Sequence, residues 1–138
     1  MKAVLADTSF LFALANCKDR NHNRVLNVAQ TLSDTLIIPS SVLPEICYLI
    51  ASRLGHSRMR SFLKELNSSE VNLEHTTPLD LIRVSEILEQ YADSKLDFVD
   101  ATIIAIAERL NIRRILTLDR RDFTMVRPRH CSYFEILP

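Results

Sequence analysis

Acidic residues occupy positions in this sequence where their carboxylates could take part in chemistry. Asp7 ends the short apolar run AVLAD and Asp119 ends RILTLD, so each acid follows a segment typical of a buried strand. Asp97 and Asp100 stand at the head of the apolar segment FVDATIIAIAERL. Helix capping would explain acids at such positions, because free N–H groups and the positive end of a helix favour a carboxylate. Capping and a shared functional site are therefore both open for Asp7, Asp97 and Asp100, whereas the alternative to such a site for Asp119 is a turn beside Arg120 and Arg121.

Glu45 is the only charged side chain between Pro39 and Arg53. Its neighbours in SVLPEICYLIA are expected to be buried, so its carboxylate should find a partner or lose its charge. An internal arginine and a bound cation are the two alternatives.

The positions of these acids favour one shared site. The carboxyl ends of parallel strands meet at one edge of a sheet, where ligands bind in open α/β folds. Clustered carboxylates repel one another and raise each other's pKa unless a cation lies between them. Ligation by oxygen alone suits Mg²⁺, with Mn²⁺ tolerated. Acids that hold such an ion in an open cleft are suited to metal-assisted hydrolysis of phosphodiester bonds.

The elements that must position these acids follow from hydrophobic periodicity. Strands are predicted at 3–7, 35–39, 71–75 and 114–119, with an edge strand at 131–138, and helices at 8–16, 22–34, 40–55, 57–69, 78–93 and 95–110. Short strands that alternate with helices predict a three-layer α/β/α sandwich around a short, mostly parallel sheet. No repeat or linker interrupts the pattern, so a single domain is expected over residues 1–138.

Composition narrows the possible functions. The chain of 138 residues contains one glycine, which excludes the common glycine-rich phosphate loops. Its net charge of zero argues against binding nucleic acid mainly through bulk electrostatics, although a local basic rim remains possible. Cys17, Cys47 and Cys131 are odd in number and widely spaced, which is typical of reduced thiols in the cytoplasm. The N-terminal stretch has neither a membrane span nor a secretory pattern, so a cytoplasmic protein without membrane contact is expected.

Four segments carry a resemblance to a known family. In chain order they are LADTSFLFAL, PEICYLI, LDFVDATIIAIAERL and ILTLDRRDF. Together they resemble the PIN-domain ribonucleases, and in particular the VapC-type toxins of prokaryotic toxin–antitoxin pairs. The resemblance extends from Ala3 to about Phe123, and only the region 56–94 carries no diagnostic motif. It implies a PIN-like fold and a metal-dependent endoribonuclease that uses Mg²⁺ or Mn²⁺.

The resemblance also assigns roles to individual acids. Asp7, Glu45, Asp100 and Asp119 match the four acids of the family's catalytic site. Asp7, Asp100 and Asp119 would be metal ligands. Asp97 matches an acid that only some members possess, so it is either an auxiliary metal ligand or a helix cap.

Other residues would support these acids. Thr8, Ser9 and Thr117 match hydroxyl residues that hold the acids by hydrogen bonds, and Asp122 precedes the phenylalanine of a family-like DF pair.

Arginines are expected to surround the acidic centre and to contact RNA. Many of the chain's arginines lie near the C-terminus, and the predicted phosphate contacts are Arg114, Arg120 and Arg121. A second basic cluster comprises Arg53, Arg58, Arg60 and Lys64. Aromatic residues are scarce among these charges, so base recognition should be limited.

The resemblance further implies protein partners. A homodimer through the helices between 43 and 66, and a cognate antitoxin that covers the cleft, are both expected. A PIN-type nuclease of RNA processing or decay and a non-catalytic PIN-like RNA-binding module remain alternatives. A phosphoryl-transfer protein is disfavoured, because Thr8 and Ser9 follow Asp7 where a response-regulator receiver or a haloacid-dehalogenase-like phosphatase has a second acid.

Overall fold

A five-stranded parallel sheet forms the centre of the computed structural model, which describes residues 2–138. Its strands are β1 (Ala3–Ala6), β2 (Thr35–Pro39), β3 (Asn72–Glu74), β4 (Arg114–Leu116) and β5 (Glu135–Leu137), and their order across the sheet is β3-β2-β1-β4-β5. Each neighbouring pair is parallel, so all five strands have their carboxyl ends at the same edge.

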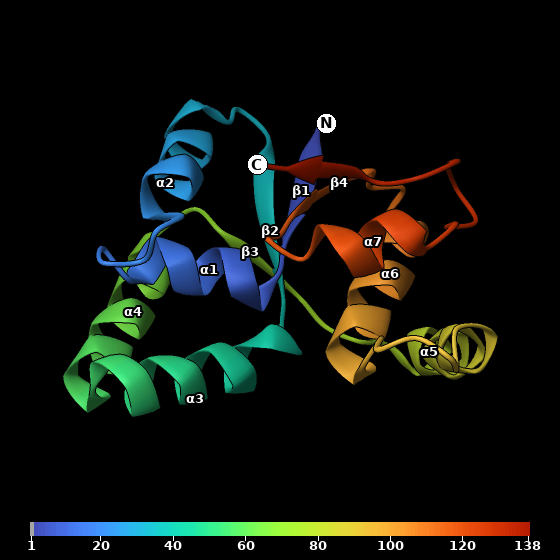
Figure 1. Cartoon of the computed structure of the whole chain (residues 1–138), viewed down its shortest axis with the longest axis horizontal. Helices are drawn as coiled ribbons and strands as arrows, with labels where there is room; N and C mark the ends of the chain where they lie inside the picture. The colour runs from blue at the N-terminus through green and yellow to red at the C-terminus, as the bar shows by residue number, and fades with distance from the viewer. Residues whose placement is uncertain (1) are drawn as a thin grey trace.

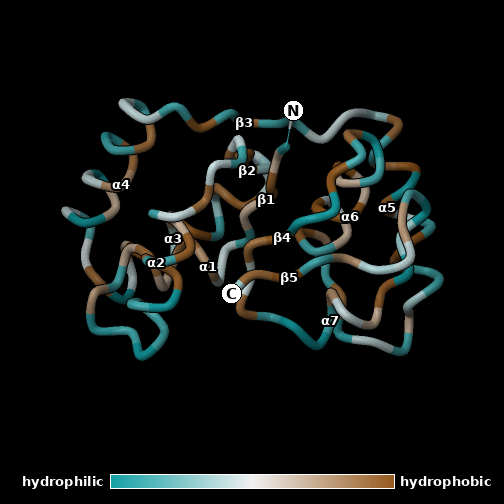
Figure 2. Tube along the Cα trace, turned by 90° about the horizontal axis from the view of Figure 1, so that it is seen from above, coloured by the Kyte–Doolittle hydropathy of each residue, from teal (hydrophilic) through white to brown (hydrophobic). Residues whose placement is uncertain are grey.

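Helices cover both faces of this sheet. They are α1 (Thr8–Ala15), α2 (His22–Thr31), α3 (Val42–Leu54), α4 (His56–Ser68), α5 (Pro78–Gln90), α6 (Phe98–Leu110) and α7 (Arg120–Met125). Figures 1 and 2 show α1 to α4 on one side of the strands and α5 to α7 on the other. The predicted three-layer α/β/α sandwich is therefore confirmed.

The topology explains this division of the helices. From β1 the chain moves outward to β2 and β3, and then returns across the sheet to β4 and β5. Crossovers between parallel strands are right-handed, so the reversal of direction places the later helices on the opposite face. The order of the strands reverses at the β1–β4 pair, which makes the crevice between their carboxyl ends the expected ligand site.

The apolar segment that begins at Phe98 is the most buried helix of the fold. Every residue of α6 from Ala101 to Ala107 is buried. This helix packs against α5 and lies over the sheet, whose strand β1 is equally inaccessible at Val4, Leu5 and Ala6. In Figure 2 the strands are largely hydrophobic and lie between the two helical layers. A rigid, buried α6 therefore fixes the position of the acids at its N-terminal end.

Most observed elements lie within three residues of the predicted bounds at each end, and two differences are larger. Residues 120–125 form α7, where a turn after Asp119 was expected, and the last strand covers only 135–137 instead of 131–138. Six residues with a mixed sequence, RRDFTM, carry too little periodicity to predict a helix. Among residues 2–138, no helix combines the length and the hydrophobicity that crossing a bilayer requires.

Candidate active site

Asp7 and Asp119, the two acids that follow strands, lie at the ends of neighbouring strands. Asp7 follows β1 and Asp119 follows β4 after two intervening residues, and the backbone N–H of Asp7 donates to the carbonyl of Leu116 over 2.9 Å. The parallel register therefore brings residues that are far apart in the sequence to one crevice.

Asp7 is a buried carboxylate that is held by hydrogen bonds. Its side chain is 6% exposed, and it accepts from the backbone N–H of Thr8 over 2.7 Å and from the hydroxyl of Thr117 over 2.8 Å. Burial raises the pKa of Asp7 to about 6 against the effect of these hydrogen bonds, and the charges of Glu45 and Asp119 raise it further. Asp7 thus caps α1, and its pKa also depends on the charges of two other predicted site acids.

A chain of hydroxyl groups supports Asp7. The only hydroxyl hydrogen of Thr117 goes to Asp7, so Ser9 must donate in the 3.1 Å contact between the Ser9 and Thr117 oxygens. Ser9 in turn accepts from the backbone N–H of Leu118 over 3.0 Å, and Thr117 accepts from that of Asp119 over 3.0 Å. These hydroxyls tie the loop after β4 to the start of α1.

Asp97 and Asp100 form a capping box at the start of α6. The Asp97 carboxylate accepts from the backbone N–H of Asp100 over 2.9 Å, and the Asp100 carboxylate accepts from that of Asp97 over 3.2 Å. The structure therefore places Asp97 as the N-cap, with an exposed side chain. Asp100 is 9% exposed, and its pKa is raised to about 8 by burial and by the charges of Asp97 and Asp7.

Asp100, Asp119 and Asp122 make up the tightest acidic group. One carboxylate oxygen from each residue lies within 4.8 Å of the others. Asp119 is the N-cap of α7 and accepts from the backbone N–H of Asp122 over 3.3 Å. Burial and the neighbouring Asp119 raise the pKa of Asp122. Sequence reasoning treated Asp122 only as a supporting residue, because its position depends on the unpredicted helix α7.

Glu45 lies in the first turn of α3, and its environment corrects the expected one. Its side chain is exposed, as are Pro44 and Tyr48, and it has no hydrogen bond or ion pair with residues 2–138. The core stripe of α3 consists of Val42, Ile46 and Ile50, so Glu45 points away from it. The expected burial and the alternative of an arginine partner are therefore both wrong, yet Glu45 is close enough to raise the pKa of Asp7.

A hydroxyl pair that was not predicted joins the starts of α3 and α6. The hydroxyl of Thr102, which is fully buried, donates to the carbonyl of Val99 over 2.6 Å. Ser41 must therefore donate to Thr102 across their 2.7 Å contact. Because this bond spans the end of the sheet, it fixes the Glu45 end of α3 relative to the Asp100 end of α6. Ser41 stands at the N-cap position of α3, but its side chain makes no capping hydrogen bond.

The acids fit a divalent cation. The six acids of the site are Asp7, Glu45, Asp97, Asp100, Asp119 and Asp122. None of them forms an ion pair with a lysine, arginine or histidine of residues 2–138, although other acids of the chain do. Several unpaired carboxylates with raised pKa values leave negative charge without compensation, and an ion with a preference for oxygen ligands would supply it. Asp100, Asp119 and Asp122 have the closest oxygen atoms for holding it, with Asp7 beside them.

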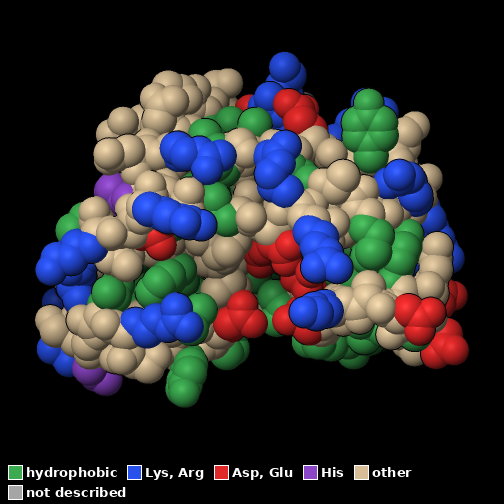
Figure 3. Space-filling view, in the orientation of Figure 1, with side chains coloured by type: hydrophobic (Ala, Val, Ile, Leu, Met, Phe, Trp, Pro, Cys, Tyr) green, Lys and Arg blue, Asp and Glu red, His purple; other side chains and the backbone are tan. Residues whose placement is uncertain are grey.

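Lysine and arginine side chains flank this acidic hollow. Figure 3 shows acidic side chains recessed near the middle of the molecule, with basic side chains on both sides of them. Most C-terminal arginines are already engaged. Arg109 pairs with Asp80 and Glu74, Arg129 pairs with Glu86, and Arg120 donates to the carbonyl of Pro138 over 2.6 Å. Of the three predicted phosphate contacts, only Arg121 has no hydrogen-bond or ion-pair partner among residues 2–138.

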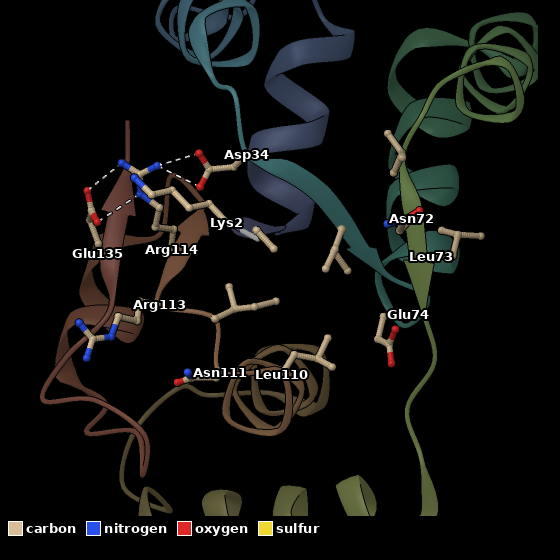
Figure 4. Close-up of a pocket in the computed structure, with 14 residues that line it drawn as sticks. Lys2, Asp34, Asn72, Leu73, Glu74, Leu110, Asn111, Arg113, Arg114 and Glu135 are labelled. Carbon is tan, nitrogen blue, oxygen red and sulfur yellow. Dashed lines mark hydrogen bonds and ion pairs between the residues drawn. The ribbon is translucent and has the colours of Figure 1, made fainter.

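Arg114 lies away from the acids, which corrects its predicted place. It begins β4, so it is at the amino end of the sheet, where it binds Asp34 over 3.0 Å and Glu135 over 3.2 Å. Figure 4 shows this pair of contacts beside a cavity of about 930 Å³. Three acids line that cavity, and each of them binds an arginine, namely Asp34, Glu135 and Glu74. The acids of this cavity are therefore compensated by arginines, whereas the acids at the opposite end of the sheet are not.

The second basic cluster serves mostly local contacts. Arg53 stacks over the ring of Phe12 at 5.6 Å, Arg58 donates to the carbonyl of Ala15, and Arg60 contacts His56.

All three cysteines are free thiols. Burial raises the pKa of Cys47 and of Cys131, so neither of these two thiols is activated as a nucleophile.

Comparisons with known proteins agree with this geometry. Residues 4–127 match the family model described as the PIN domain. Ribonuclease VapC26 of Mycobacterium tuberculosis is 30% identical over 135 residues, which cover 98% of this chain and 100% of that protein. The 23S rRNA-specific endonuclease VapC20 of the same species is 27% identical over 129 residues, covering 91% of this chain and 98% of that protein.

Solved structures agree with the sequence comparisons. The crystal structure of M. tuberculosis VapC20, described as a Sarcin-Ricin loop cleaving toxin, superposes with a TM-score of 0.80 at 25% identity and covers 86% of this chain and 91% of that one. VapBC2 from Rickettsia felis, bound to a DNA fragment from their promoter, has the same fold, with a TM-score of 0.71 at 18% identity and 99% coverage of both chains. The family model spans most of the sequence and VapC26 aligns over nearly all of it, so this chain belongs to the PIN-domain family.

Proposed function

We propose that this protein is a metal-dependent endoribonuclease that hydrolyses RNA phosphodiester bonds and acts as the toxin of a toxin–antitoxin pair. The observation that carries the proposal is the group of carboxylates without cationic partners at the β1–β4 crevice. The names of VapC26 and VapC20, a ribonuclease and an rRNA-specific endonuclease, support RNA as the substrate class.

The proposed cation is Mg²⁺, with Mn²⁺ as a substitute. Asp7, Asp100 and Asp119 would hold it, with Asp122 nearby and Asp97 acting mainly as the helix cap. When bound, the ion would lower the pKa of a water molecule and neutralise charge on the scissile phosphate.

The chain's own residues perform the remaining tasks in this proposal. Asp100 and Asp119 are the candidates for accepting the proton of the attacking water, and the one that does so is the one not fully engaged with the ion. Thr117 and Ser9 hold Asp7 in one orientation through their hydroxyl chain. Glu45, whose charge acts on Asp7, is exposed and free to orient water or the leaving group.

RNA would approach across the positive rim of the hollow. Arg121 is the predicted phosphate contact that remains available, while Arg120 keeps its role in the proposal only if RNA competes with the carbonyl of Pro138. Arg114 is not proposed as a phosphate contact, because its contacts place it at the other end of the sheet.

Cleavage of single-stranded RNA tests this proposal. The wild-type protein with Mg²⁺ should cut, and chelation with EDTA should stop it. Asp7→Asn and Asp100→Asn should abolish cleavage while circular dichroism shows a preserved fold, whereas Glu65→Gln, an exposed acid on α4, should cut normally. Wild-type rates in both site variants would reject the mechanism.

We further propose a cognate antitoxin and a homodimer through the helices between 43 and 66. The description of VapC20 as a toxin supports the antitoxin, and Tyr48, which is 72% exposed in that region, supports an uncovered surface. A small protein encoded directly upstream should co-purify with this chain when both are expressed. Light scattering should then give the mass of a complex with two copies of the chain, and a monomeric mass would contradict the dimer.

A further inference from the structure

A second cavity adjoins the acidic group on the side of the α5–α6 loop. It measures about 360 Å³ and is lined by Gln90, Tyr91, Asp93, Ser94, Lys95, Arg121, Asp122 and Met125. Asp122 lines this cavity and is also a member of the tightest acidic group, so the cavity borders that group. Pockets that hold small ligands span roughly 300–1,000 Å³, and this one is therefore suited to a single small unit of a larger substrate.

The cavity carries two cations that nothing else in the described chain uses. Lys95 and Arg121 are both exposed, and neither has a hydrogen-bond or ion-pair partner among residues 2–138. Arg83, Arg109 and Arg129, by contrast, bind acids. Cations without a direct hydrogen bond or ion pair are available to a phosphate, although the charge of Arg121 acts on Asp122 and lowers its pKa against the effect of burial.

The same cavity offers a surface for a base. The Tyr91 ring is fixed in place, since its hydroxyl oxygen accepts from the backbone N–H of Arg127 over 2.9 Å. The loop behind it is held by the Ser94 hydroxyl, which donates to the carbonyl of Tyr91 over 2.6 Å and accepts from the backbone N–H of Leu96 over 3.2 Å. Met125 adds an exposed apolar side chain, and Asp93 and Gln90 add polar groups for the edge of a base. A fixed aromatic ring near free cations is the combination that binds single-stranded nucleic acid.

We propose that this cavity, the loop subsite, binds one nucleotide that flanks the scissile phosphate, with its phosphate at Lys95 and Arg121 and its base against Tyr91. The proposal rests on the ribonuclease function proposed above and adds the residues that determine where along the RNA the acids act.

Binding of RNA to the Asp100→Asn variant tests the phosphate half of the loop subsite, because that variant should leave the RNA intact. The probe is a short single-stranded RNA that contains the position cut by the wild type. Lys95→Gln and Arg121→Gln, each added to Asp100→Asn, should weaken binding about tenfold and reduce the slope of log affinity against log salt by about 0.7 for each lost phosphate contact. Arg113→Gln is the matched control. Its side chain is also exposed and has no hydrogen-bond or ion-pair partner among residues 2–138, but it lines the cavity at the other end of the sheet and should change neither quantity.

An abasic scan of the same RNA tests the base half. In the Asp100→Asn protein, one abasic position next to the cut should weaken binding by about tenfold, which corresponds to the loss of one stacked base. That penalty should vanish when Tyr91→Leu is added and persist with Tyr91→Phe, which keeps the ring.

The outcomes separate this inference from the nuclease proposal. If the wild type cuts RNA, but Lys95→Gln and Arg121→Gln behave like Arg113→Gln or the abasic penalty survives in Tyr91→Leu, the loop subsite is wrong and the nuclease stands. If the wild type neither binds nor cuts RNA with Mg²⁺, the proposed function itself has failed.

Discussion

The hydroxyl of Thr117 donates a 2.8 Å hydrogen bond to the carboxylate of Asp7, which lies 110 positions earlier in the chain. This bond joins the loop after β4 to the residue that ends β1, and it is supported by Ser9. It explains how a buried acid keeps one orientation without a cationic side chain beside it.

Replacing this hydroxyl should impair catalysis more than folding. Thr117→Val keeps the shape of the side chain but removes the donor, so Asp7 loses a bond that lowers its pKa. Groups that orient a metal ligand typically contribute 10–100-fold, and we expect RNA cleavage to fall by about tenfold at saturating substrate. The pH at which activity reaches half its maximum should move upward. Thr117→Ser, which retains the hydroxyl, should restore most of the activity, and an equal loss in both variants would contradict the orienting role.

Glu45→Gln should separate charge from stability. Because Glu45 is exposed, its replacement should change the free energy of unfolding by less than about 0.5 kcal/mol. Because Glu45 is proposed to orient water or the leaving group, we expect cleavage to fall by about tenfold, even though removal of its charge should lower the pKa of Asp7. Steady-state kinetics and urea denaturation measure the two effects, with Glu65→Gln as the exposed control. Unchanged kinetics in Glu45→Gln would exclude this residue from the site.

Without divalent ions, the site acids should make the protein less stable as the pH rises. The ordinary pKa of an aspartate carboxyl is 3.8, and the pKa of Asp100 in the folded chain is about 8. Between these two values the folded protein retains a proton that the unfolded chain has released. The contribution of this proton is complete below about pH 4 and is lost as the pH rises through about 8. Asp7 adds the same dependence up to about pH 6.

Asparagine at position 100 imitates the protonated acid and isolates this effect. In EDTA at pH 8, the melting temperature of Asp100→Asn should exceed that of the wild type by about 5 °C, and at pH 4 the two should agree. Mg²⁺ should raise the melting temperature of the wild type at pH 8 and leave the variant unchanged. A wild type that is the more stable protein at pH 8 in EDTA would contradict the burial of an uncompensated charge.

The arginines that bind acids should matter for folding instead of for RNA. Asp80 is 3% exposed, accepts from Arg109, and completes the capping box of α5 with Thr77. Burial alone would raise its pKa, but the bonds from Arg109 and Thr77 outweigh that effect and lower it. Asp80→Ala removes both the ion pair and the cap, and we expect the free energy of unfolding to fall by about 2–3 kcal/mol. Urea denaturation measures this loss, and RNA affinity measured where the variant is folded should stay unchanged.

The sequence was sufficient to predict most elements and the edge of the sheet where the acids meet. Asp7 and Asp119 follow apolar strands, and that context predicts both at the carboxyl edge of a parallel sheet. That their strands are neighbours became known only from the structure. The same reasoning applies to Arg114, since a residue at the start of a strand must lie at the opposite edge. Because Arg114 is close to Arg120 in the sequence, it was grouped with the predicted phosphate contacts although it begins a strand.

Other features depended on contacts that no local pattern reveals. The apolar letters around Glu45 suggested burial, but the helix buries only the stripe that contains Ile46 and Ile50. The Ser41–Thr102 bond spans 61 positions and became visible only when α3 and α6 were placed together. Asp97 caps α6 as expected and also lies beside Asp100, so its two interpretations do not exclude each other. Asp119, for which a turn was the alternative, caps α7 and belongs to the acidic group.

The most direct test of the central claim is calorimetric titration of Mn²⁺ into the metal-free protein at neutral pH. The wild type should bind the ion with release of protons, because binding displaces the protons held by the buried acids. Asp100→Asn and Asp119→Asn should each lose that binding while remaining folded, and Glu65→Gln should retain it. Binding of equal strength in the wild type and in both site variants would show that these carboxylates do not converge on a cation, and the proposed nuclease would lose its basis.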